Sequence, residues 1–320
     1  MYEKAIAGAN VKADDSIEVP AGSSKTVSFT LSLPAGFDDN HYVEGFLSFT
    51  GSDKTKLSIP YMGFHGNWAK QAIFDPMNGQ AAQLIDFSDS TVLWATSALD
   101  GQPHILGSVS DTDPIDPDNI AISTSSAAAI TTLQGQAYLF RNAQDVTYQI
   151  VNSDGDVVAT LNKEPQDTKT YYYANASAFE TLNFPKWDGT IFDQSTGDYV
   201  AAPDGQYTYR VSAVGDGDKE SDRQTLDLPF KVDSVAPELQ HIAISSEDVN
   251  GKTQYYLTGE TKDDFSGIDA TKDCGTAVNG LVELHQTFEV TGTTADGYTQ
   301  VRVPVTDAQA KTLAQGNNAT

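Results

Sequence analysis

Short apolar segments separated by turn-forming residues recur at intervals of about ten residues along this chain. The segments are rich in Val, Thr, Tyr and Phe, which favour strands. Sustained apolar repeats at helical spacing are nearly absent, and only residues 178–184 and 306–315 are short helix candidates. The pattern therefore predicts an all-β chain built of stacked β-sandwiches.

The clearest hairpin lies in residues 146–161, where apolar and polar residues alternate on both sides of Asn-Ser-Asp-Gly. The Asp-Gly step supplies the positive φ that a tight turn needs. Asn152, Asp154 and Asp156 resemble the start of a calcium loop. However, a strand-like segment follows at once and no distal bidentate carboxylate is present, so the pattern favours a turn.

Two changes of composition divide the chain. After a strand-like segment that ends near Trp68, the sequence becomes rich in loop residues, and Pro114 and Pro117 exclude regular structure there. A short polar linker with Pro237 precedes a new strand-like segment. We expect three domains, over residues 1–67, 68–234 and 235–320.

The charge and the cysteine content exclude several classes of function. The 320 residues carry a net charge of -25 and no cluster of Lys and Arg, so nucleic acid and anionic membrane surfaces are poor partners. Cys274 is the only cysteine, which excludes an internal disulfide and a thiolate metal site. The sequence predicts no membrane span and no export signal, and both ends resemble the interior of a larger protein, so we expect a fragment.

The sequence predicts no catalytic residues. It contains no G-x-S-x-G, no H-E-x-x-H and no phosphate-binding glycine loop. His65 follows a strand-like segment and lacks a recognisable partner motif, so it is interpreted as a turn or interdomain residue.

One acidic loop is a candidate cation site. Asp216, Asp218, Glu220 and Asp222 recur at every second residue, and carboxylate oxygens are calcium ligands. Asp216, Asp218 and Asp222 are therefore candidate ligands of calcium, the one cofactor that the sequence suggests. A mobile hairpin loop with solvated charges is the favoured alternative. A second acidic stretch, residues 262–270, is likewise better explained as a solvated loop.

Several segments resemble one known family. Residues 42–68, YVEGFLSFTGSDKTKLSIPYMGFHGNW, are similar to the end of the first fibronectin type III-like domain of lactocepin-type cell-envelope proteinases and the related streptococcal complement-cleaving peptidases. Residues 138–161, 186–190, 202–214 and 231–237 are similar, in this order, to the second such domain. The resemblance covers most of residues 15–245.

The resemblance implies two to three tandem fibronectin III/immunoglobulin-like sandwiches, of which the first is truncated at its N-terminus and the last at its C-terminus. It implies a secreted, cell-wall-associated parent protein: a subtilisin-like serine endopeptidase whose catalytic triad lies outside this chain. Expected partners are the parent catalytic domain and protein substrates such as casein-like or host proteins.

The expected role of this chain is that of a noncatalytic accessory region that positions the catalytic domain and contributes to substrate binding. The alternative is an adhesion or binding module of a bacterial surface protein. Tyr61, Phe64 and Trp68 would be structural junction residues that bury an exit strand against the next domain, with Trp68 substantially buried.

Overall fold

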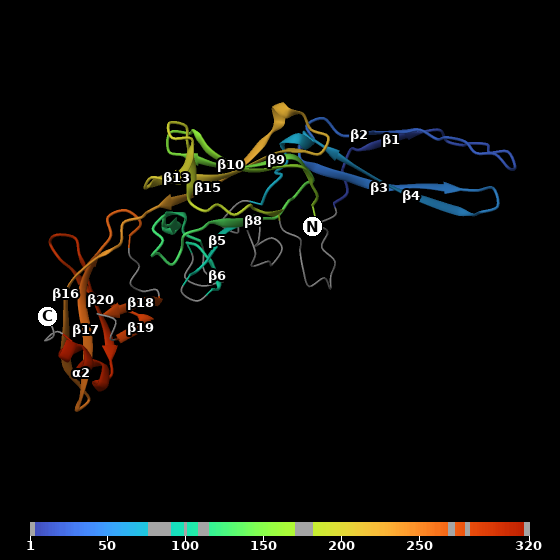
Figure 1. Cartoon of the computed structure of the whole chain (residues 1–320). Coiled ribbons are helices and arrows are strands. Elements are labelled where there is room, and N and C mark those ends of the chain that lie inside the picture. The colour runs from blue at the N-terminus through green and yellow to red at the C-terminus, as the bar shows by residue number, and fades with distance from the viewer. Residues whose placement is uncertain are drawn as a thin grey trace. The chain divides into compact units, whose positions relative to one another are not determined.

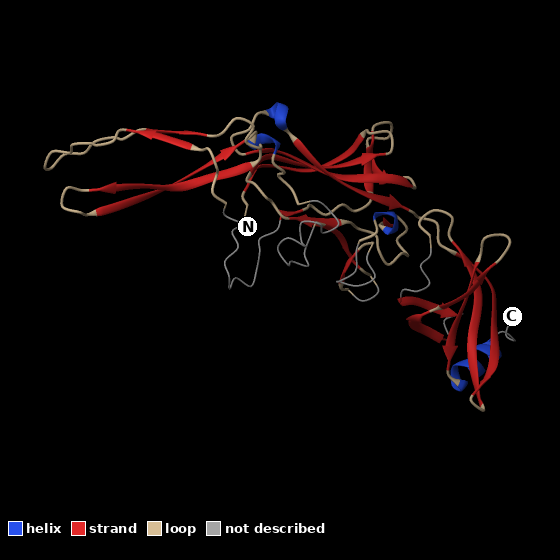
Figure 2. Cartoon of the chain, turned by 180° about the vertical axis from the view of Figure 1, so that it is seen from behind, coloured by secondary structure: helices blue, strands red, loops and turns tan. Residues whose placement is uncertain are grey.

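The computed structural model describes residues 4–75, 91–98, 101–107, 115–169, 182–267, 273–278 and 282–316. The chain divides into two compact units, Met1–Gln71 and Ala72–Thr320. Strands dominate the described part, and helices are few and short (Figure 2). The all-β prediction is confirmed, and the limits of the three expected domains stay a prediction. No helix of the described residues is long and apolar enough to cross a membrane.

The first unit consists of two antiparallel strand pairs (Figure 1). Strand β1 (Asn10–Ala13) pairs with β2 (Phe29–Ser32), and β3 (His41–Thr50) pairs with β4 (Lys56–His65). Tyr61 on β4 packs on Phe29 of β2, with ring centroids 5.2 Å apart. A 3-10 turn, η1 (Trp68–Lys70), follows, and its first turn is capped because the Asn67 side chain accepts a hydrogen bond from the Ala69 amide.

The second unit contains a sandwich of two sheets. The larger sheet has the strand order β10-β9-β14-β15-β7 and the smaller the order β11-β8-β5-β6. The larger sheet comprises β7 (Ala121–Ile122), β9 (Ala143–Asn152), β10 (Val157–Asp167), β14 (Gly205–Gly215) and β15 (Gln224–Val232). The smaller comprises β5 (Val92–Thr96), β6 (Pro103–Ile105), β8 (Gln134–Ala137) and β11 (Leu182–Asn183).

The inward-facing side chains of both sheets form one buried core. Alternate residues are buried over 146–150 of β9 and 207–211 of β14, as expected for strands with one face on a core, and the end of β14 is buried on both faces. The core includes Tyr148, Tyr209 and Leu228 from the larger sheet and Leu93 from the smaller, all fully buried. Burying Tyr148 and Tyr209 raises the pKa of each hydroxyl, so both stay neutral at physiological pH.

The expected hairpin over residues 146–161 is present as β9 and β10. Gly155 in its turn has a φ of +86°. The Asn152 side-chain oxygen accepts hydrogen bonds from the amides of Asp154 and Asp156, so it stabilises the turn. This contact supports the turn interpretation.

A short hairpin, β12 (Thr190–Asp193) and β13 (Asp198–Ala201), is anchored to the sandwich at its base. Trp187 is 1% exposed, packs on Phe230 and donates a hydrogen bond from its indole nitrogen to the Thr190 carbonyl. Trp187 therefore joins the sandwich core to the turn before β12, where Gly189 supplies a positive φ of +78°.

The last sheet has the order β16-β17-β21-β20. Its strands are β16 (Glu238–Val249), β17 (Lys252–Lys262), β20 (Glu289–Thr293) and β21 (Thr299–Val305); β18 (Asp273–Val278) and β19 (Val282–Thr287) form a separate pair. The helix α2 (Asp307–Gly316) agrees with the helix candidate at 306–315. The other candidate, 178–184, lies mostly outside the described residues and ends in β11.

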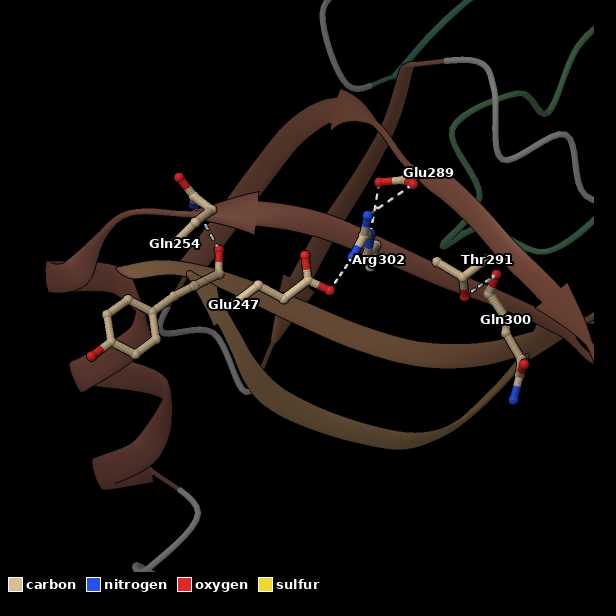
Figure 3. Close-up of polar contacts among 7 residues, drawn as sticks. Glu247, Gln254, Glu289, Thr291, Gln300 and Arg302 are labelled. Carbon is tan, nitrogen blue, oxygen red and sulfur yellow. Dashed lines mark hydrogen bonds and ion pairs between the residues drawn. The ribbon is translucent and has the colours of Figure 1, made fainter. Parts of the chain in front are cut away.

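Arg302 of β21 contacts side chains on the three other strands of this sheet. Its guanidinium lies between Glu289 of β20 and Glu247 of β16, at 2.7 Å from each carboxylate (Figure 3). It also lies over the Tyr256 ring of β17, 4.5 Å from the centroid. These contacts link all four strands through one side chain.

Candidate interaction surfaces

Two of the three residues expected at a junction, Phe64 and Trp68, belong to one aromatic group within the first unit. Phe64 and Trp68 are in edge contact, with ring centroids 4.9 Å apart, and Tyr42 touches both. Tyr61 lies on the opposite face of β4, against Phe29. Trp68 is 41% exposed, so the expectation that it is substantially buried is wrong. Part of its side chain therefore reaches solvent. The junction role itself stays a prediction.

His65 contacts a carboxylate, an aromatic ring and a backbone amide. Its Nε2 lies 3.4 Å from the Asp39 carboxylate, and its ring packs on Phe37 with centroids 5.4 Å apart. Its carbonyl accepts a hydrogen bond from the Asn40 amide, which closes the loop beside β3. His65 is the last residue of β4, so the structure places it at a strand end beside this loop rather than in a turn.

The acidic loop between β14 and β15 does not bring its carboxylates to one point. Asp216 accepts a hydrogen bond from Gln144, and Asp218 binds Arg141. Asp222 belongs to the 3-10 turn η3 (Glu220–Asp222), where its amide donates to the Lys219 carbonyl. The described residues hold no group of three or more His, Cys, Asp or Glu side chains placed to bind a metal. Calcium binding by Asp216, Asp218 and Asp222 stays a prediction without support from this geometry.

The second acidic stretch also forms a turn. The Asp263 carboxylate accepts hydrogen bonds from the amides of Phe265 and Gly267. Asp269 lies outside the described residues.

The Arg141–Asp218 pair is the most buried ion pair of the described residues. The guanidinium Nη2 lies 2.6 Å from Asp218 Oδ2, and the two side chains are 4% and 7% exposed. Gly215 makes room for it, because a Cβ there would lie 2.3 Å from Asp218 Oδ2 and 2.6 Å from Arg141 Nη2. Asp218, one of the candidate calcium ligands, is therefore part of a buried structural ion pair.

Asp75 is a buried carboxyl group in the sandwich. It is 4% exposed, its amide donates to the Tyr138 carbonyl, and its carbonyl accepts from the Thr91 hydroxyl. Among the described residues its Oδ1 has no hydrogen-bond partner. Burial raises the pKa of Asp75 to about 6, because the charged form loses its hydration.

A groove of about 1320 Å³ lies between β10 and the β12–β13 hairpin. One wall is Val157–Leu161, and the other is formed by residues 190–194 with Tyr199 and Val200; Trp187 lies at the base. Phe192 and Tyr199 face each other across the hairpin, with ring centroids 5.5 Å apart, yet both are exposed. This surface was not predicted from the sequence, although the apolar residues within 190–193 and 198–201 indicate it.

The groove carries more negative than positive charge. Asp188, Asp193 and Lys186 line it. Hydrogen bonds from the Ser195 hydroxyl and amide lower the pKa of Asp193, so this carboxylate stays ionised in mildly acidic solution.

Comparisons with known proteins bear on the whole chain. A family model described as an Fn3-like domain matches residues 2–62. The chain is 44% identical over its full length to the PI-type proteinase of Lactococcus lactis subsp. cremoris and to the PII-type proteinase of Lacticaseibacillus paracasei. It is 27% identical, over 72% of its length, to the C5a peptidase of Streptococcus pyogenes.

The chain spans about 17% of the length of the PI- and PII-type proteinases and 25% of the C5a peptidase. The resemblance to cell-envelope proteinases is therefore confirmed and extends beyond residues 15–245 to the full chain. The similarity concerns one segment of much longer proteins.

Proposed function

We propose that this chain is a noncatalytic accessory region of a cell-wall-associated, subtilisin-like serine protease. In this role it positions the catalytic domain and adds contacts to protein substrates outside the catalytic cleft. The observation that carries the proposal is the 44% identity over all of this chain to a segment that makes up only 17% of a proteinase.

The residues of the chain agree with a noncatalytic role. A serine protease needs a serine, a histidine base and an orienting carboxylate in mutual contact. The sequence holds no nucleophile motif, and among the described residues His65 contacts a carboxylate and an aromatic ring rather than a serine. In this proposal the catalytic triad lies elsewhere in the parent protein.

Contacts outside the cleft have a defined benefit for a protease that acts on large proteins. A short peptide fills only the cleft beside the nucleophile, whereas a protein extends beyond it and reaches neighbouring domains. Binding energy gained there is available to the reaction without being part of its chemistry. Loops and grooves on a rigid sandwich are suited to this role.

Both parts of the proposal are tested on the purified chain. We expect no cleavage of casein or of small chromogenic peptides, and measurable binding of unfolded casein in a biosensor assay. Inhibitor-sensitive cleavage would contradict the noncatalytic role. If the chain bound casein no better than an unrelated acidic β-sandwich does, the substrate-contact role would be wrong.

A further inference from the structure

We infer that the groove between β10 and the β12–β13 hairpin binds an extended segment of a protein substrate that presents apolar side chains flanked by Lys or Arg. The inference rests on the proposed function, because it names the surface through which this region would contact its substrate.

Exposed aromatic side chains first point to this surface. Tyr199 is 73% exposed and Phe192 49%, and the neighbouring apolar residues Val157 and Val200 are also partly in water. Aromatic residues that remain exposed beside a concave surface are typical of protein-binding sites, where they lose water on contact. Phe192 and Tyr199 also stabilise their own hairpin by cross-strand contact, so the test must separate this structural role from ligand binding.

Both walls of the groove pack against the buried core of the sandwich. Ile191 of the hairpin and Ala159 and Leu161 of β10 pack against the sandwich core. At the hairpin base, the Ala202 amide donates to the Gly189 carbonyl at 2.8 Å, next to the buried Trp187. A surface fixed in this way loses little conformational entropy when a ligand binds.

The open edge of β10 does not favour binding by strand addition. In the described sheet β10 pairs only with β9, and its register shifts twice, between Val157 and Ala159 and between Thr160 and Asn162. Bulges twist an edge strand away from further pairing, and Pro165 lacks an amide hydrogen. Recognition therefore depends on side chains in the groove rather than on a backbone ladder.

The charge of the groove selects the ligand. Asp188 and Asp193 line the groove together with one cation, Lys186, and the whole chain carries a net charge of -25. An acidic ligand would be repelled, whereas Lys or Arg beside apolar side chains complements both features.

The size of the groove favours a chain segment over a small molecule. Its volume of about 1320 Å³ exceeds the range of about 300–1000 Å³ that is usual for small-molecule pockets. An extended peptide also matches the elongated wall formed by Val157–Leu161.

The test uses the full 320-residue chain and two fluorescent ten-residue peptides. One alternates Lys with Val or Phe, and the other has Glu in place of Lys. Fluorescence anisotropy measures binding to the wild type, to Tyr199→Ser, and to Val157→Ser on the opposite wall. Phe46→Ser on β3 is the matched control, because Phe46 is 73% exposed, as Tyr199 is.

We expect the Lys peptide to bind the wild type and the Phe46→Ser variant equally, and each groove variant about tenfold more weakly. The Glu peptide should bind at least tenfold more weakly than the Lys peptide. The inference is overturned if the groove variants bind as the wild type does, or if the two peptides bind alike. Unfolding midpoints within one degree of the wild type show that a groove variant keeps its fold; if Tyr199→Ser fails this check, Val157→Ser decides.

Binding of unfolded casein by the same variants separates this inference from the proposed function. If the wild type binds casein and both groove variants bind it equally well, the inference about the groove is wrong and the proposed accessory role stands. If the wild type binds neither casein nor the Lys peptide, the substrate-contact role fails as a whole.

Discussion

Removing the acidic partner of Arg141 should strongly destabilise the sandwich. The Arg141 and Asp218 side chains are 4% and 7% exposed and 2.6 Å apart. At an effective dielectric constant of about 20, two charges at this distance attract each other by about 6 kcal/mol, much of which offsets the loss of their hydration. In Asp218→Asn the guanidinium stays buried without its counter-charge. We expect the free energy of unfolding to fall by about 3–5 kcal/mol.

The assay is urea unfolding followed by tryptophan fluorescence and far-ultraviolet circular dichroism. The matched control is Asp227→Asn, because Asp227 also binds an arginine, Arg210, at 2.7 Å, but the two side chains are 32% and 43% exposed. This control should cost less than about 1 kcal/mol. The double variant Arg141→Met with Asp218→Asn should cost less than the sum of its single variants.

The reasoning is refuted if Asp218→Asn costs no more than Asp227→Asn. It is also refuted if the effects of Arg141→Met and Asp218→Asn simply add, because the pair would then not act as a unit.

Three further predictions concern pH, the core and calcium. The pKa of Asp75 is raised to about 6, so the folded state favours its protonated carboxyl group. The contribution of this group to the free energy of unfolding is therefore full below about pH 4 and is lost as pH rises through about 6. The difference in unfolding free energy between wild type and Asp75→Asn should change by at most about 3 kcal/mol across that window, and a constant difference would disprove it. Trp187→Ala should lower the unfolding free energy by about 3–5 kcal/mol, and a cost below about 1 kcal/mol would show that Trp187 is not part of the core. Titration calorimetry should show no saturable heat of calcium binding at millimolar concentration, because Arg141 already binds Asp218. If such heat appears and the double variant Asp216→Asn with Asp222→Asn abolishes it, the calcium site is established.

Local patterns predicted much of the fold. The β9–β10 hairpin follows from alternation on both sides of an Asp-Gly turn, and α2 lies at the helix candidate over residues 306–315. These features depend on residues close together in the sequence, where turn chemistry and side-chain period act directly.

The long-range contacts could not be predicted in this way. Arg141 and Asp218 are 77 positions apart, so their pairing depends on the sheet that places β9 beside β14. The exposure of Tyr199 depends on which face of a short hairpin turns away from the core. Neither follows from periodicity alone, because a pattern of period two does not say which elements meet.

The central claim is that this region contributes to the recognition of protein substrates by a parent protease. The most direct measurement is kcat/KM for one short peptide and one long protein substrate, in the parent enzyme and in a variant that lacks residues 72–320. The account predicts that the truncation leaves kcat/KM for the peptide within about twofold and lowers that for the protein at least tenfold. An equal loss on both substrates would contradict it, because the region would then only brace the catalytic domain.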